Sequence, residues 1–214
     1  MSNKTKAATQ TVASKFTVET VQIKIAEVLK EIVARTPVSS EEESQTPFER
    51  AHQLKYAACL KSAAISGTLA IPPGPMGMLT ILPDLMAIWS LQQQLVSDIA
   101  SCFGKRGVLT REVMLYCLFR HGAAFLARDL VVRAGERILV RRVALRTFQQ
   151  LLKKIGIQIT QKTIGRSLSR WVPILGAAGV AAYSYYDTKC VAETAIELFS
   201  QPVVVDEEAR DQPA

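Results

Sequence analysis

Two aspartates are the residues of this sequence best placed for chemistry, because each directly follows a long apolar stretch. Asp84 follows residues 62–83, which carry no charge, and Asp187 follows the apolar residues 171–186. A carboxylate at the edge of an apolar segment must accept hydrogen bonds, meet a cation or take up a proton. Because Asp84 comes directly after Pro83, we expect it to stand at a helix start and accept backbone N–H bonds. Asp187 has the same two roles open to it, structural or chemical. Its candidate partners are Lys189 and Arg170.

The other polar candidates give little support for catalysis. His52 and His121 are the two histidines, and the sequence holds neither a GxSxG nor an HExxH motif. Gln93 lies in a run of three glutamines, whose amides can make polar contacts between helices or bind a ligand. We therefore expect no catalytic residue, metal or cofactor. A cryptic hydrolase stays as an alternative, with candidate residues Asp84, His121 and Asp187.

An arginine-rich block between the two apolar stretches could bind anions. The whole chain carries a net charge of +7, whereas residues 128–170 hold eleven cations and two acids, a surplus of +9. Several of these arginines recur every fourth residue, which on a single helix would make a basic stripe on one face. The candidate lipid- or anion-binding residues are Arg133, Arg137, Arg141, Arg142, Arg146, Lys153 and Lys154.

Three interpretations are open for such a block. A basic helix with an apolar side fits an anionic membrane surface. A solvated face, partly neutralised by Glu41–Glu43 or by the acidic C-terminal residues, is the second interpretation. Nucleic acid is the third, and we do not expect it, because the block has one aromatic residue, Phe148, and no recognised nucleic-acid motif.

The elements that must position these residues are predicted to be helices. Helical spacing of apolar residues marks residues 16–35, and Thr46–Glu49 gives a helix start that should run to about Ile71. The prolines of residues 72–75 cannot continue that helix, so a second helix should return antiparallel and end at Gly104. Thr110 starts the next helix, a helical pattern continues to Ser169, and a last helix is expected over residues 173–199.

The sequence thus predicts an all-α fold, a multi-helical bundle with a central Pro/Gly-broken apolar helical hairpin. No run of alternating residues indicates a strand, and Val203–Val205 is too short to count as one. We expect a disordered lead over residues 1–15, one helical domain over residues 16–200 and a disordered acidic tail over residues 201–214.

Neither apolar stretch has the length of an ordinary membrane span, which needs about 20 apolar residues. Residues 62–71 give ten before the proline break, and residues 171–186 give sixteen. The hairpin can therefore be buried in the core, re-entrant or spanning. The four cysteines, Cys59, Cys102, Cys117 and Cys190, show no CxxC pair, which argues against a zinc site. Cys59, Cys102 and Cys117 fall among apolar neighbours, which predicts buried free thiols in a reducing compartment.

Six segments share a pattern of small residues, prolines and glutamines: Gly67–Pro75, Leu82–Leu85, Gln92–Gln94, Ile99–Gly104, Val172–Ala177 and Thr188–Lys189. This pattern resembles the EcsC family of bacterial proteins. This resemblance covers about residues 54–199 and implies a helical, membrane-associated protein, with a membrane protein or transporter as a candidate partner. It transfers no biochemical activity. The chain has no GxxxxGK[ST] phosphate loop, so it lacks the nucleotide site of the GTPases that carry similar segments.

Together these features predict a non-enzymatic binding or regulatory protein of EcsC type. It would dock on anionic lipid at the inner, cytoplasmic face of a membrane, through the arginine block and the apolar hairpin. A soluble helical scaffold for protein partners is the first alternative, and the cryptic hydrolase is the second. The sequence leaves the oligomeric state open.

Overall fold

The computed structural model describes residues 23, 25–32, 35–69, 81–123, 126, 130–134, 137–167 and 173–206. Most of this part is helical, and the predicted all-α fold is confirmed, with one small sheet added. Besides a helical segment over residues 25–32, the elements are α2 (Pro47–Leu69), α4 (Ile81–Cys102), the short 3-10 helix η1 (Arg106–Val108), α5 (Arg111–Phe119), β1 (Val131–Ala134), β2 (Arg137–Arg141), α7 (Leu145–Ser167), α8 (Pro173–Phe199) and β3 (Val203–Asp206).

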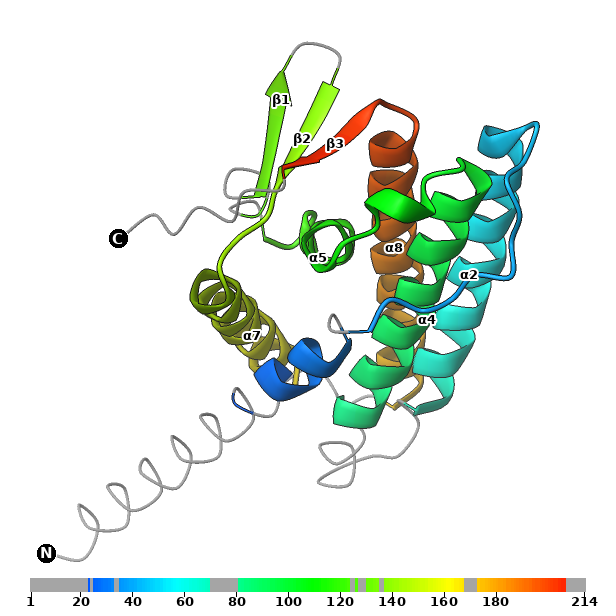
Figure 1. Ribbon diagram of the computed structural model, residues 1–214. Coiled ribbons are helices and arrows are strands. Elements are labelled where there is room, and N and C mark those ends of the chain that lie inside the picture. The colour runs from blue at the N-terminus through cyan, green and yellow to red at the C-terminus, as the bar shows by residue number, and fades with distance from the viewer. Residues whose placement is uncertain are drawn as a thin grey trace, which may run out of the picture.

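Three long helices, α2, α4 and α8, form one layer of the molecule (Figure 1). α2 runs antiparallel to the other two, as the predicted hairpin requires, although the turn at residues 70–80 lies outside the described residues. Small residues let α2 and α8 pack closely: a Cβ built on Gly67 would lie 3.4 Å from the Cβ of Ala181. In the same interface, the Ser62 hydroxyl donates to the Ser184 carbonyl at 3.2 Å.

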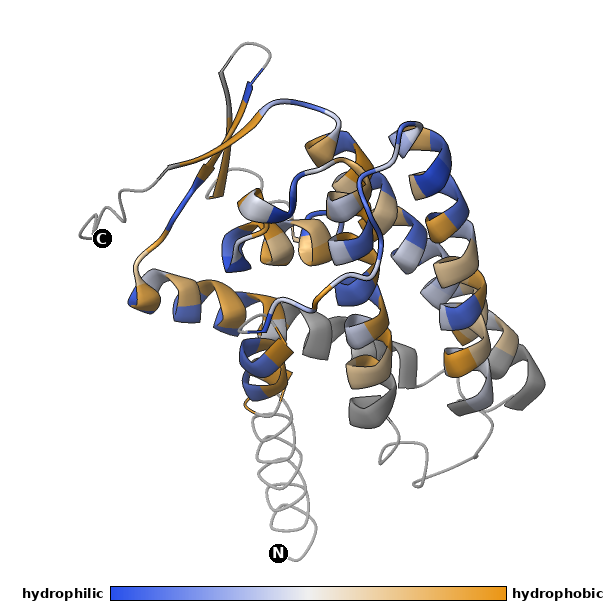
Figure 2. Cartoon of the chain, turned by 45° about the vertical axis from the view of Figure 1, so that its right-hand side comes forward, coloured by the Kyte–Doolittle hydropathy of each residue, from blue (hydrophilic) through white to orange (hydrophobic). Residues whose placement is uncertain are grey.

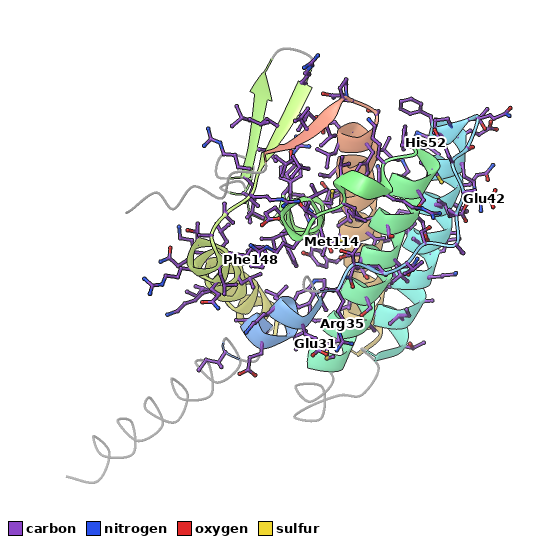
Figure 3. All side chains as sticks on the ribbon, viewed as in Figure 1. Glu31, Arg35, Glu42, His52, Met114 and Phe148 are labelled. Atoms are coloured by element: carbon purple, nitrogen blue, oxygen red, sulfur yellow. The ribbon has the colours of Figure 1, made fainter. Side chains whose placement is uncertain are left out.

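The short helix α5 lies between this layer and the rest of the fold, and it is buried on every side. Its residues from Glu112 to Phe119 are all buried, as expected for a helix that is apolar around its whole circumference. Phe119 packs edge-on against Trp89 of α4, with ring centroids 5.6 Å apart. Side chains of α5 and α7, among them Met114 and Phe148, fill the space between those two helices (Figure 3).

Arg111 at the start of α5 holds the beginning of α7 in place. Its guanidinium stacks 4.7 Å over the ring of Phe148 and donates to the Val143 carbonyl at 3.0 Å. A third contact, to the buried carboxylate of Glu112 at 2.8 Å, balances the charge of the arginine. The helix itself starts as predicted, because Thr110 accepts a hydrogen bond from the Val113 N–H.

The structure corrects the prediction of continuous helix through the arginine block. Residues 131–134 and 137–141 instead form an antiparallel pair of strands, and β3 adds to β2 in parallel to complete a sheet of order β1-β2-β3. Alternation decides this: Ile138 and Val140 are buried on one face of β2, and Arg137 and Arg141 are exposed. Residues 203–206, which the sequence analysis assigns to the disordered tail, are therefore part of the fold.

The end of α4 follows the sequence prediction in detail. Gly104 has a positive φ of 67°, its N–H donates to the Ser101 carbonyl, and the Lys105 N–H donates to the Ala100 carbonyl, each at 2.8 Å. These two bonds form a Schellman motif, in which a residue without a side chain avoids strain at the left-handed position.

Cys59, Cys102 and Cys117 are buried free thiols, as predicted.

Replacing Gly104 with alanine should lower the free energy of unfolding by about 1–2 kcal/mol, because alanine is strained at this φ. The added Cβ would also stand 2.6 Å from the carboxylate of Glu43, which must move aside. Gly107→Ala is the matched control, since its φ is not in the left-handed range and its Cβ would meet nothing within 4 Å. Urea denaturation of both variants measures the effect. Equal stability of the two would show that the motif does not depend on glycine.

Candidate functional site

The candidate basic residues come from two elements and the loop between them, not from one helix. Arg137 and Arg141 project from the exposed face of β2, and Arg142 follows directly in the loop to α7. The single basic stripe predicted for a helix is therefore wrong. Arg133 lies in β1 opposite Ile138, and its side chain is outside the described residues.

Three further candidate cations, Arg146, Lys153 and Lys154, lie on α7, whose two faces differ sharply. Phe148, Leu151, Leu152 and Ile155 recur at helical spacing and are buried in the core. Arg146, Lys153 and Lys154 are exposed on the outer part of the helix. Arg146 and Lys153 lie about two turns apart and therefore share one face. Packing of the apolar face thus fixes the direction in which the cations point.

We call residues 137–154 the basic segment. From residue 137 to the end of α7 at 167 the sequence holds eight cations and no acid. Arg50 and Arg120, elsewhere in the fold, pair with Glu41 and Glu197. By contrast, no ion pair within the described residues involves the segment's cations Arg137, Arg141, Arg142, Arg146 and Lys153.

The basic segment also exposes an apolar side chain at its centre. Leu145, between Arg142 and Arg146, is 58% exposed at the first residue of α7. In the second interpretation of the sequence, the acidic run at residues 41–43 partly neutralises the arginine block. Glu41 instead forms a two-pronged ion pair with Arg50, with N–O distances of 2.8 and 2.9 Å, and this guanidinium lowers the pKa of the Glu41 carboxyl. The segment therefore presents cations around one exposed leucine.

Asp187 is the centre of a second polar feature, which joins three parts of the fold. One carboxylate oxygen, Oδ2, accepts a hydrogen bond from the Gln92 amide of α4 at 2.8 Å. The other, Oδ1, lies 2.7 Å from Nε2 of His121, just after α5, and 3.3 Å from the hydroxyl of Tyr183 on α8. The Gln92 amide also donates to the Thr188 hydroxyl at 3.2 Å. We call these five residues the Asp187 cluster.

The Asp187 carboxylate is held in its ionised form. Burial raises the pKa of Asp187, but hydrogen bonds from His121, Gln92 and Tyr183 and the charge of His121 outweigh it, so the pKa lies below its usual value. Of the two cation partners considered from the sequence, the structure describes only Lys189. Lys189 instead lies 3.8 Å from Glu193, and Arg170 is outside the described residues.

The Asp187 cluster has one acceptor without a donor. Gln92 is fully buried, and its Oε1 has no hydrogen-bond partner among the described atoms. Exchanging Oε1 and Nε2 by a flip of the amide would not help, because Oε1 would then face the Asp187 carboxylate and both are acceptors. The orientation of Gln92 is thus set by Asp187, and the orphaned oxygen is a cost of that arrangement.

An aspartate–histidine pair can orient an imidazole as a general base, provided that a nucleophile lies at the other ring nitrogen. Within the described residues, the hydrogen bond from His121 runs to Asp187 alone. No group of three metal-ligating side chains occurs in the same part of the chain. These hydrogen bonds make the cluster a junction between α4, α8 and the end of α5.

The two remaining candidates from the sequence, Gln93 and Asp84, both lie on α4. The Gln93 amide donates to the carbonyls of Ile32 and Arg35, so it ties the end of the helical segment 25–32 to α4. Asp84 is the fourth residue of α4, which already begins at Ile81, so it stands inside the first turn and not at the capping position. Its side chain lies outside the described residues.

Comparison of the chain with protein-family models, with curated proteins and with solved structures finds no match in any of the three. Among the described residues, every helix falls short of the length or the apolar character that a membrane crossing needs.

Proposed function

We propose that this chain is a non-enzymatic protein of EcsC type that docks on an anionic membrane surface through its basic segment. The observation that carries the proposal is the exposure of six cations, Arg137, Arg141, Arg142, Arg146, Lys153 and Lys154, in a stretch without acids. Near an anionic leaflet each cation contributes about 1 kcal/mol. Leu145 adds an exposed side chain that can enter the interface.

The geometry favours docking from the outer side of the sheet and α7. Both elements lie on the other side of α5 from the three-helix layer (Figure 1). The apolar hairpin stays a second proposed contact with the membrane, and its turn at residues 70–80 lies outside the described residues. Anionic lipids are enriched in the cytoplasmic leaflet, so the inner face of the membrane is the proposed location. A membrane protein at that face remains the proposed partner.

The test is binding of the purified protein to vesicles. We expect sedimentation with vesicles of phosphatidylglycerol and phosphatidylcholine, and no sedimentation with phosphatidylcholine alone. Because the Debye length falls from about 8 Å at 0.15 M salt to about 3 Å at 1 M, high salt should release the protein. Equal binding to both kinds of vesicle, or binding unchanged by salt, would contradict an electrostatic dock.

A further inference from the structure

A groove of about 410 Å³ lies between the helical segment 25–32 and α7. The two elements lie against each other in both ribbon views (Figures 1 and 2). Its apolar lining comes from Ile23, Ala26, Leu152 and Ile157. This volume is within the range of about 300–1,000 Å³ found for sites that bind small molecules.

The groove is left open because the helical segment turns three of its large apolar residues away from it. Ile25, Leu29 and Ile32 point from the helical segment into the core, where all three are buried. Ala26, on the side that meets α7, is too small to fill the space beside Leu152. Ile23 stays 54% exposed at the groove. An apolar ligand lying here would cover surface that is otherwise left in water.

Charged side chains of the groove favour an anion over a cation. Lys30 contributes a cation from the helical segment, and Lys153 contributes one from α7, against the single acid Glu27. Lys153 also belongs to the basic segment, and Arg146 lies on its face of α7. An apolar channel therefore opens beside the same cations that we propose to meet a lipid surface.

We propose that this groove holds one acyl chain of an anionic lipid, with the lipid headgroup at Lys153 and Lys30. The proposal rests on the proposed function, since docking through the basic segment is what brings the lipid to the groove. The groove provides the apolar surface, and the two lysines provide charge complementarity at its edge. It predicts recognition of an anionic amphiphile in solution, without any membrane.

The sharpest test compares two neighbouring lysines with one anionic probe. Lys153→Glu and Lys154→Glu make the same change of charge at adjacent exposed positions of α7, but Lys153 alone of the two lines the groove. With dansyl-labelled undecanoic acid as the probe, we expect Lys153→Glu to weaken binding about tenfold. We expect Lys154→Glu to weaken it by about twofold or less. Equal loss in the two variants would overturn the proposal, because it would show a general charge effect.

Filling the groove tests its apolar part. Ala26→Trp should abolish probe binding, whereas Ala57→Trp, at an exposed position of α2, should leave it unchanged. Lysophosphatidylglycerol should displace the probe, and glycerol phosphate, which has the headgroup without the chain, should not. Far-ultraviolet circular dichroism checks the fold of both tryptophan variants. If Ala26→Trp fails to fold, the two lysine variants still decide the matter.

Vesicle binding separates this proposal from the proposed function. Wild-type protein that binds anionic vesicles but not the probe would refute the groove and leave the docking intact. Protein that binds the probe but not the vesicles would refute the docking and support the groove as an amphiphile site. Displacement of the probe by glycerol phosphate would refute the acyl-chain site and indicate a simple anion site.

Discussion

Replacing Arg137, Arg142 and Arg146 with glutamate should release the protein from anionic vesicles. Removing three cations costs about 3 kcal/mol of membrane affinity at about 1 kcal/mol each, which is more than a hundredfold. Reversing their charge adds repulsion. All three side chains are exposed, so we expect the variant to fold. Arg141 is left in place because its register partner is Asp206, and a glutamate there would set two acids side by side. Sedimentation with vesicles measures the change.

The matched control reverses the charge of three cationic side chains elsewhere on the surface. Arg35, Lys61 and Lys189 are all exposed and lie outside the basic segment. Arg35 and Lys189 pair with Glu31 and Glu193 one turn away, but both pairs are exposed and contribute only about 0.3–0.5 kcal/mol each. Changing them to glutamate gives the same net charge as the first variant. We expect this control to keep most of its vesicle binding, and both variants to melt within a few degrees of the wild type. Equal release of both would mean that overall charge governs binding and that the basic segment is not the dock.

Asp187→Ala should lower the free energy of unfolding by about 3 kcal/mol. The side chain is 16% exposed, and its two oxygens accept hydrogen bonds from Gln92, His121 and Tyr183. Its loss removes an acceptor from all three, although the buried Gln92 amide keeps its bond to Thr188. Removing one partner of a buried charged contact costs about 3–5 kcal/mol, and the partial exposure places this one at the lower end. Chemical denaturation at pH 7 measures it. Glu193 is 49% exposed, so Glu193→Gln, which loses the ion pairs to Lys55 and Lys189, should cost less than about 1 kcal/mol.

The same carboxylate predicts a dependence of stability on pH. Because the folded pKa of Asp187 lies below its usual value, the ionised form stabilises the fold at pH above about 3.9. This contribution is lost as the pH falls through the lower folded pKa. We therefore expect the gap in stability between the wild type and Asp187→Asn to shrink between pH 5 and the acid limit. A gap that stays constant down to about pH 2 would show that the charge of Asp187 is irrelevant.

Local signals predicted the helices α2, α4 and α8, because each has its signal within a few residues of one end. Thr46 and Pro47 mark the start of α2, Pro173 marks that of α8, and Gly104 closes the end of α4. The sheet had no such mark. Arginines four residues apart suit both a helix of 3.6 residues per turn and a strand of period 2, so Arg137 and Arg141 favoured neither.

The buried contacts of the Asp187 cluster and β3 were beyond sequence reasoning for a different reason. Asp187 and His121 lie 66 positions apart, and no local pattern links an aspartate to so distant a histidine. Three valines at residues 203–205 are too few for a strand alone and become one only because β2 offers them a partner. The exposure of the cations follows a general rule, since long charged side chains rarely bury without a partner.

The parallel pairing of β2 with β3 has a consequence for how this protein is made. Ile138 donates its N–H to the Pro202 carbonyl at 2.9 Å and lies opposite Val203. The central strand β2 therefore gains its second neighbour only after residues 202–206 have been synthesised. Until then β1 and β2 form a two-stranded hairpin, which is marginal by itself in water. The open edge of β2 is thus exposed to other chains while α7 and α8 are being synthesised. The solubility of nascent chains should therefore improve abruptly once Val203–Asp206 leave the ribosome.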